Sequence, residues 1–178
     1  MALPTAILYR KQMNEGDPLP YRPCVGVMLV NAEGKAFVGK RIDNREGDWW
    51  QMPQGGVDPG EDLEAAMRRE VGEETGIPGR LLDVIARLPE ELVYDLPEEL
   101  QGKLWGGRFR GQRQTWYLVR FTGSDADIDL KAHGEPEFCE WKWVDPELLP
   151  ALIVPFKREV YQAIVDGFRD KVPSSNFD

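Results

Sequence analysis

The chain has 178 residues, of which 42% are hydrophobic and 30% are charged, and this length suits a single domain with one good core. Its formal net charge of -9 would repel long polyanions, because non-specific affinity for nucleic acid depends on many Lys and Arg contacts to phosphate. A small ligand, or only the tip of a large one, fits this charge better.

The N-terminal segment contains charges and prolines but no apolar run as long as a signal peptide, and no uncharged stretch is long enough to span a bilayer. We therefore expect a soluble, cytoplasmic protein that makes no membrane contact, and no obligate protein partner is evident from the sequence. Cys24, Cys139 and His133 provide neither a disulfide framework nor a zinc site, so both cysteines are expected to be buried free thiols.

Turn-forming residues divide the chain into alternating strands and helices. Residues 24–30 (CVGVMLV) are apolar and rich in β-branched side chains, and residues 36–41 follow at hairpin spacing, so these segments are expected to pair. Residues 62–75 are predicted to form a helix that begins at the cap residue Asp62 and ends before Gly76.

The second half of the chain continues this alternation. Residues 83–88, 115–122 and 140–144 have strand character, and residues 156–168 carry apolar side chains at helical spacing. The proline- and glycine-containing segment 89–114 is expected to be a long functional loop. Together the elements predict one α+β domain over the whole chain, with an N-terminal extension (1–20) and a flexible tail (169–178).

The first predicted helix carries carboxylates where an amphipathic helix normally buries apolar groups. At about 100° per residue, Glu70 and Glu74 fall on the apolar stripe, and Glu73 lies at its edge. Like charges at this spacing destabilise a helix unless a cation lies among them, and hard oxygen ligands suit Mg²⁺ or Mn²⁺. The alternative is a solvated acidic face in which the glutamates pair with Arg68 and Arg69.

The loop that leads into this helix favours the metal site over the solvated face. Residues 51–61 read QMPQGGVDPGE, and its glycines let the backbone come close to a ligand or an ion. Gly72 lies inside the helix, where glycine costs about 0.5–1 kcal/mol relative to alanine. Close packing against this helix is therefore expected.

These residues match the signature of the Nudix hydrolases. Gly55, Glu61 and residues 69–77 (REVGEETGI) occupy every fixed position of that signature. Over about residues 20–168 the chain also resembles the bacterial branch that contains RNA pyrophosphohydrolases and dinucleoside polyphosphate hydrolases. The segments that carry this resemblance are YRP at 21–23, WQMPQGG at 50–56, YDLP at 94–97, GQRQTW at 111–116, PEF at 136–138 and FKREVY at 156–161. The resemblance implies an α/β/α sandwich with a central mixed sheet, in which a loop-helix-loop holds divalent metal.

The resemblance also implies roles for individual residues. The metal ligands, for Mg²⁺ or Mn²⁺, would be Glu70, Glu73 and Glu74, with the backbone carbonyl of Gly55 or Gly56 as a further ligand. Arg69 would orient the glutamates through charge-assisted hydrogen bonds. Glu137 would be a ligand or the general base, and the identity of the base varies within the family.

Substrate contacts are expected from cations and from an exposed platform. Lys40, Arg41 and Arg113 are candidates for phosphate contacts, and the resemblance adds Arg22 and Gln54. Bases would stack on residues that could equally belong to the core, namely Tyr94, Val154 and Phe156.

Three functions remain open from the sequence. The first is hydrolysis of dinucleoside polyphosphates such as diadenosine tetraphosphate, and the low isoelectric point of about 4.8 favours this small substrate. The second is removal of pyrophosphate from triphosphorylated RNA 5′ ends. The third is an inactive nucleotide-binding regulator, against which the intact set of glutamates argues.

Overall fold

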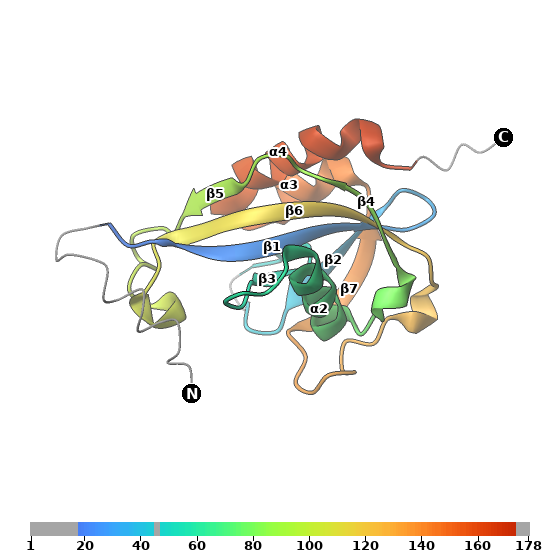
Figure 1. Cartoon of the computed structure of the whole chain (residues 1–178), viewed down its shortest axis with the longest axis horizontal. Coiled ribbons are helices and arrows are strands. Elements are labelled where there is room, and N and C mark those ends of the chain that lie inside the picture. The colour runs from blue at the N-terminus through green and yellow to red at the C-terminus, as the bar shows by residue number, and fades with distance from the viewer. Residues whose placement is uncertain (1–17, 45–46, 174–178) are drawn as a thin grey trace.

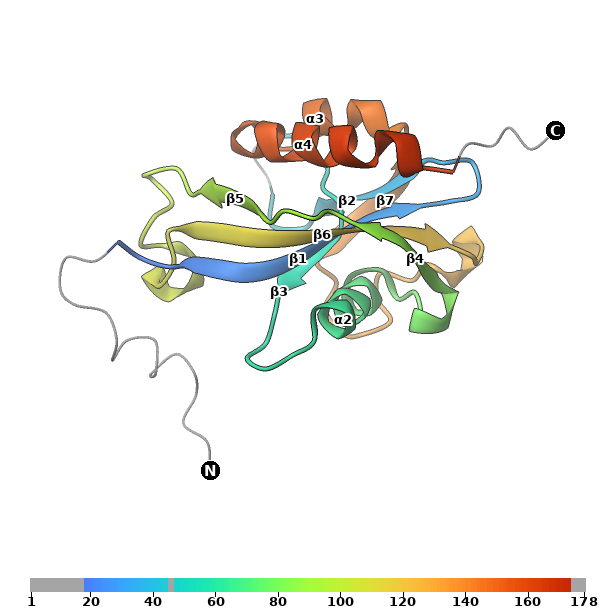
Figure 2. The same cartoon turned by 45° about the horizontal axis from the view of Figure 1, so that its top comes forward.

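The computed structural model describes residues 18–44 and 47–173, so most of the predicted N-terminal extension and the last five residues of the predicted tail lie outside the described residues. A mixed sheet lies between helices, with α2 (Leu63–Thr75) on one face and α3 (Leu149–Leu152) and α4 (Arg158–Phe168) on the other (Figures 1 and 2). The predicted α/β/α sandwich is confirmed. In the described part of the chain, no helix has the length and apolar character needed to cross a membrane.

Two long strands form the centre of the sheet. β1 (Tyr21–Val30) and β6 (Gly111–Phe121) run parallel along their whole length, from the pair Tyr21 and Gly111 to the pair Val30 and Arg120. The sheet order is β4-β6-β1-β2-β7, and two short strands pair at the sides, β3 with β1 and β5 with β6. The bounds of these strands are Ala36–Arg41 for β2, Gln54–Gly56 for β3, Leu82–Arg87 for β4, Leu92–Asp95 for β5 and Phe138–Val144 for β7.

The central strand β1 is buried on both faces, which explains its continuous apolar sequence. Val25, Val27 and Leu29 pack in the core beneath α2, whereas Met28 and Val30 pack in the core beneath α3 and α4. The sheet therefore separates two cores, and the candidate glutamates lie on the α2 side.

The prediction of one long loop over residues 89–114 was wrong in part. Leu92–Asp95 forms β5, and β6 already begins at Gly111 because its first residues pair with the start of β1 on one side and with β5 on the other. The short strand β3 was also missed, since two of its three residues are glycines and such a segment has little strand propensity.

Two further expectations differ from the structure. Cys24 is buried, but Cys139 is exposed, because it lies on the edge strand β7. The predicted helix over 156–168 begins as a single 3-10 turn at Pro155–Lys157, and regular α-helix starts at Arg158. A further 3-10 turn, Arg169–Lys171, continues into the start of the predicted tail.

Candidate active site

Capping fixes both ends of α2. The Asp62 side chain accepts a hydrogen bond from the Ala65 amide at 3.0 Å, and Gly76, in the left-handed region at φ 76°, donates its amide to the Gly72 carbonyl at 2.9 Å. The apolar face of the helix packs on β1 and buries Ala66, Met67 and Val71. The other buried positions of the helix are Glu70, Glu74 and Thr75.

Glu70 and Glu74 are both buried against the sheet, at 8% and 1% exposed. The carboxyl group of Glu70 occupies the space beside Gly55 so closely that a Cβ on Gly55 would overlap it. Both carboxyl oxygens of Glu74 are buried, and neither has a hydrogen-bond partner among the described residues. A buried carboxyl group without a partner is costly, so something beyond these side chains is needed to compensate it.

Burial also changes the acidity of these two groups. It raises the pKa of Glu70 to about 7, although the adjacent Arg69 guanidinium opposes the rise. The pKa of Glu74 lies well above its usual range, first because of burial and then because Glu137 and Glu70 add negative potential. The protein thus holds carboxylates that repel one another, as expected where a cation binds.

Arg69 connects the loop to the helix through hydrogen bonds to four partners. Its Nε and Nη2 donate to Glu61 at 2.8 Å each, and Nη2 also donates to the Gly56 carbonyl at 2.9 Å. Its Nη1 donates to Glu70 at 2.8 Å and to Glu73 at 3.4 Å. The paired guanidinium lowers the pKa of Glu61 to about 2. These bonds have the geometry expected of a residue that orients the glutamates.

The structure does not bring all three helix glutamates together. The side chain of Glu73 is 51% exposed and lies beside Arg69, whereas Glu70 and Glu74 point toward the sheet. Accordingly, residues 18–44 and 47–173 contain no group of three or more His, Cys, Asp or Glu side chains arranged to hold a metal ion. The Gly56 carbonyl, a predicted ligand, already accepts the hydrogen bond from Arg69.

Glu137 lies in the loop that precedes β7, and its side chain is exposed. Its backbone carbonyl accepts a hydrogen bond from the Ile42 amide at 2.9 Å, next to the pair formed by Arg41 and Phe138. The hydrogen bond to Asp43 is the main cause that raises the pKa of Arg41, and the charges of Glu137 and Glu74 add to the rise. The end of β2 therefore lies near the buried glutamates.

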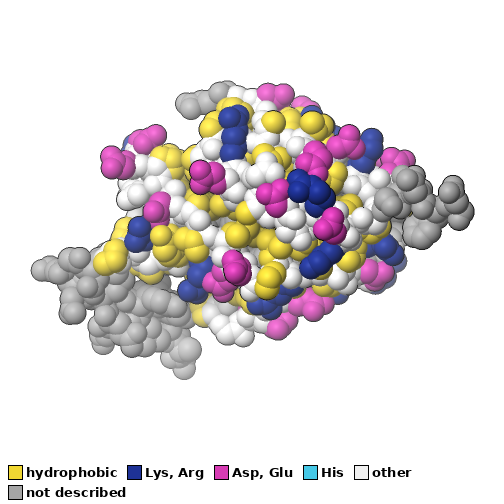
Figure 3. Space-filling model, turned by 90° about the horizontal axis from the view of Figure 1, so that it is seen from above, with side chains coloured by type: hydrophobic (Ala, Val, Ile, Leu, Met, Phe, Trp, Pro, Cys, Tyr) yellow, Lys and Arg dark blue, Asp and Glu magenta, His cyan; other side chains and the backbone are white. Residues whose placement is uncertain are grey.

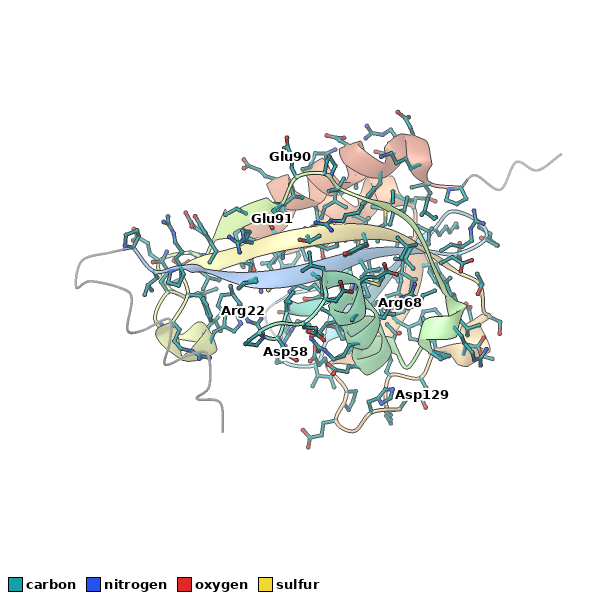
Figure 4. The ribbon with its side chains drawn as sticks, in the orientation of Figure 1. Arg22, Asp58, Arg68, Glu90, Glu91 and Asp129 are labelled. Carbon is teal, nitrogen blue, oxygen red and sulfur yellow. The ribbon has the colours of Figure 1, made fainter. Side chains whose placement is uncertain are left out.

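Each of the three cations predicted to contact phosphate has a carboxylate partner. Lys40 lies 3.1 Å from Asp48, and Arg41 donates two hydrogen bonds of 2.8 Å to Asp43. Arg113 lies 2.9 Å from Glu91, which Figure 4 places next to β5, away from α2.

Arg22 lies at the end of the sheet where the loop from β3 leads into α2, and Asp58 of that loop lies below it in the view of Figure 4. Its guanidinium lies so close to Gly56 that a Cβ on that glycine would come within 2.5 Å of it. The guanidinium also lies 5.4 Å from the ring centroid of Trp105. Trp105 has φ 52°, a conformation that non-glycine residues rarely adopt.

Gln54 is half-buried and hydrogen-bonds to a pair of buried amides on β6, a network that sequence reasoning did not identify. Gln114 donates to Gln54 at 2.8 Å and to Gln112 at 2.7 Å, and Trp116 donates its indole N–H to Gln114 at 2.9 Å. The alternation of these residues along β6 is the signal that could have revealed a polar face. This network fixes the orientation of the Gln54 amide.

The three residues predicted to stack on bases lie partly in the core and partly at the surface. Tyr94 is 7% exposed and belongs to the core beneath α4, whereas Phe156 is 36% exposed, with its ring centroid 5.9 Å from that of Tyr94. Val154 is partly buried and packs against the same core. A groove of about 400 Å³ between β5 and α4 is lined by Tyr94 and Phe156 among others.

Lys157 is the residue that sequence reasoning missed most clearly, although it lies within a segment that carried the resemblance. Its ammonium group lies 5.3 Å from the ring centroid of Tyr94 and 5.8 Å from that of Phe156. Within the described part of the chain, its side chain has no hydrogen bond or ion pair. Burial, followed by the charge of Arg41, lowers its pKa to about 8. An ammonium group beside two rings is suited to an anionic, aromatic ligand.

Comparisons with known proteins agree with this arrangement. The sequence model described as the NUDIX domain matches residues 20–164. An RNA pyrophosphohydrolase of Novosphingobium aromaticivorans is 62% identical over 154 residues, which are 86% of this chain and 96% of that relative. An RNA pyrophosphohydrolase of Erythrobacter litoralis is 62% identical over 156 residues, which are 88% of this chain and 95% of that protein.

Solved structures show the same fold at low sequence identity. The E. coli dihydroneopterin triphosphate pyrophosphohydrolase aligns with a TM-score of 0.63 and 21% identity over 83% of this chain and 98% of its own. A C. elegans Ap4A hydrolase aligns with a TM-score of 0.60 and 19% identity over 84% and 98%. With the signature residues placed on their loop and helix and the domain matched over most of its length, the chain belongs to the Nudix family and is a pyrophosphohydrolase that acts on acid anhydrides.

Proposed function

We propose that the protein removes pyrophosphate from the triphosphorylated 5′ end of RNA, with Mg²⁺ or Mn²⁺ as cofactor, in the cytoplasm. The observation that carries the choice of substrate is the 62% identity to RNA pyrophosphohydrolases across nearly their whole length. The observation that supports the chemistry is the buried, partnerless carboxyl group of Glu74 beside Glu70.

The residues at this site fit a small, hard divalent cation. Glu70 and Glu74 are oxygen donors of the kind that Mg²⁺ and Mn²⁺ prefer, and the absence of a side chain at Gly55 leaves room for the Glu70 carboxyl group. Glu73 would join them by turning away from Arg69, to which it is bound only at 3.4 Å. The carbonyl of Gly55 is the better backbone candidate, because Arg69 already uses that of Gly56.

The reaction transfers a phosphoryl group from an anhydride oxygen to the oxygen of water. When bound, the cation supplies neutralising charge to the phosphate oxygens and lowers the pKa of water. Glu137 is the candidate that accepts the proton from the attacking water, since it is an exposed carboxylate whose charge acts on Glu74. The new bond joins the water oxygen to the α-phosphorus, the anhydride bond between the α- and β-phosphates breaks, and pyrophosphate leaves with the bridging oxygen. Arg69 keeps Glu70 and Glu61 in position throughout.

The remaining site residues would bind the substrate. Lys40, Arg41, Arg113 and Arg22 would contact its phosphates and Gln54 would supply an oriented amide, while Phe156 offers an exposed ring for the first bases. The groove beside Phe156 extends the platform toward α4. Only the 5′ end of the RNA is expected to contact the protein.

Hydrolysis of dinucleoside polyphosphates is the second candidate, and it remains a prediction. The net charge of -9 favours it, as does the pairing of Lys40, Arg41 and Arg113 with carboxylates. On the face that carries α4, basic side chains are interspersed with acidic ones (Figure 3). As far as the structure describes it, such a face has no continuous positive charge that could bind an extended polyanion.

Product analysis tests the proposed function. The purified protein is incubated with Mg²⁺ and a short 5′-triphosphorylated RNA, and both the released phosphate species and the RNA end are identified. We expect pyrophosphate and a 5′-monophosphorylated RNA, and no turnover in excess chelator. Glu74→Gln should lower the rate by roughly 100-fold or more while circular dichroism shows a retained fold. Intact triphosphorylated RNA after incubation with active enzyme would refute the proposed substrate.

A further inference from the structure

The cations at the end of β2 are neutralised by two aspartates that follow the strand. Asp43 accepts two parallel hydrogen bonds of 2.8 Å from Arg41, and Asp48 lies 3.1 Å from Lys40. The side chains of Asp43 and Asp48 are 67% and 76% exposed. Exposed ion pairs contribute little free energy, so a more highly charged anion can replace either carboxylate.

Asp48 is nevertheless held in place by a buried residue. The indole N–H of Trp50 donates to Asp48 at 3.1 Å, and Trp50 is only 6% exposed. The backbone amide of Trp50 donates to the Leu152 carbonyl at 2.8 Å, and the ammonium group of Lys142 lies 4.1 Å from the centroid of the indole ring. The indole thus keeps the Asp48 carboxylate beside Lys40 even when substrate is absent.

Both pairs lie at the end of β2, where Arg41 is the cation closest to the reaction site. Arg41 is paired with Phe138 across the sheet, and the next amide, that of Ile42, donates to the Glu137 carbonyl at 2.9 Å. A phosphate group bound between Glu137 and the buried glutamates would therefore lie near Arg41, and Lys40 precedes Arg41 on the same strand. To contact them, it must compete with Asp43 and Asp48.

We propose that Asp43 and Asp48 are specificity-determining residues, which act as internal anions that a substrate must displace from Lys40 and Arg41. A terminal triphosphate concentrates several negative charges within a few ångströms and can displace both carboxylates. A phosphodiester backbone or a 5′ monophosphate carries fewer charges in the same space and competes less well. The two aspartates thereby favour triphosphorylated ends over product and over internal RNA. This inference rests on the proposed function, because it uses Lys40 and Arg41 as phosphate contacts.

The test replaces each carboxylate by its amide, in Asp43→Asn, Asp48→Asn and the double variant. KM for a short 5′-triphosphorylated RNA should fall by roughly two- to five-fold for each substitution, with kcat unchanged, as expected for the loss of a weak exposed ion pair. Inhibition by the matching 5′-monophosphorylated RNA should strengthen by a larger factor than KM falls, because selectivity is lost. The matched control is Glu147→Gln, which removes one charge and one carboxylate from Arg169 at the opposite end of β7.

Binding of inorganic tripolyphosphate by calorimetry separates this inference from the proposed function. Tighter binding by the Asp43 and Asp48 variants, with wild-type binding by the control, supports the inference even if RNA proves not to be the substrate. Unchanged or weaker binding and an unchanged or higher KM in both aspartate variants would overturn it. An equal gain in the control would also overturn it, since net charge alone would then explain the effect.

Discussion

Gly55 shows how a single missing side chain makes room for a functional group. Its backbone lies against the Glu70 carboxyl group, and an added Cβ would overlap that group. We expect Gly55→Ala to lower kcat/KM by roughly 10- to 100-fold because Glu70 must move, with partial recovery at higher Mg²⁺ concentration. Gly79→Ala is the control, because no heavy atom lies within 4 Å of a Cβ there. Equal activity of both variants and wild type would show that the position of Glu70 is unimportant.

Lys157 predicts a pH dependence of substrate binding. Because burial lowers its pKa to about 8, the charged ammonium form is present below that pH and is lost as the pH rises through it. KM for a triphosphorylated RNA should therefore rise between pH 7 and about pH 9. Lys157→Arg keeps its charge and should flatten this rise, whereas Lys157→Met should raise KM at pH 7 to the value that wild type reaches above about pH 9. A pH profile of KM that is the same in wild type and Lys157→Met would contradict a role in binding.

For individual residues, the sequence predicted the positions of some side chains and not of others, and each outcome has a physical reason. Glu70 and Glu74 were expected on the buried stripe of the helix and lie there, since helical periodicity fixes the face. Glu73 was expected beside them, but an exposed side chain at the edge of the stripe is drawn to Arg69. The partners of Lys40 and Arg41 could not be predicted, because exposed ion pairs depend on how the following segment folds back.

The helix α2 depends on its cap as well as on its packing. Asp62→Ala removes the side-chain acceptor of the Ala65 amide and should lower the free energy of unfolding by about 1 kcal/mol, measured by urea unfolding at an unchanged m-value. Asp62→Asn is the matched control, because it removes the charge but retains an acceptor. If both variants lose the same stability, the charge rather than the hydrogen bond stabilises the start of α2.

Elements with strong local signals were predicted well, and those that depend on tertiary pairing were not. The helix over 62–75 was predicted to within one residue because a cap and a terminal glycine define its ends. β3 and β5 have three and four residues and form only because β1 and β6 offer free pairing partners. Short strands of this kind carry little periodicity of their own.

At the scale of the whole molecule, the distribution of charge limits how much of an RNA can be bound. The chain has a net charge of -9, and Lys40, Arg41 and Arg113, the three cations predicted to contact phosphate, each pair with a carboxylate. Few counterions should therefore be released on binding, which gives a shallow dependence of affinity on salt. Recognition then depends on the 5′ phosphates and the first bases.

The ratio of kcat/KM for a short 5′-triphosphorylated RNA to that for diadenosine tetraphosphate, measured with Mg²⁺ at two salt concentrations, tests the proposed function most directly. We predict a ratio clearly above one that changes little with salt and that rises little when the RNA is lengthened beyond a few nucleotides. A ratio below one at both salt concentrations would contradict RNA as the preferred substrate and would make the dinucleotide the first candidate.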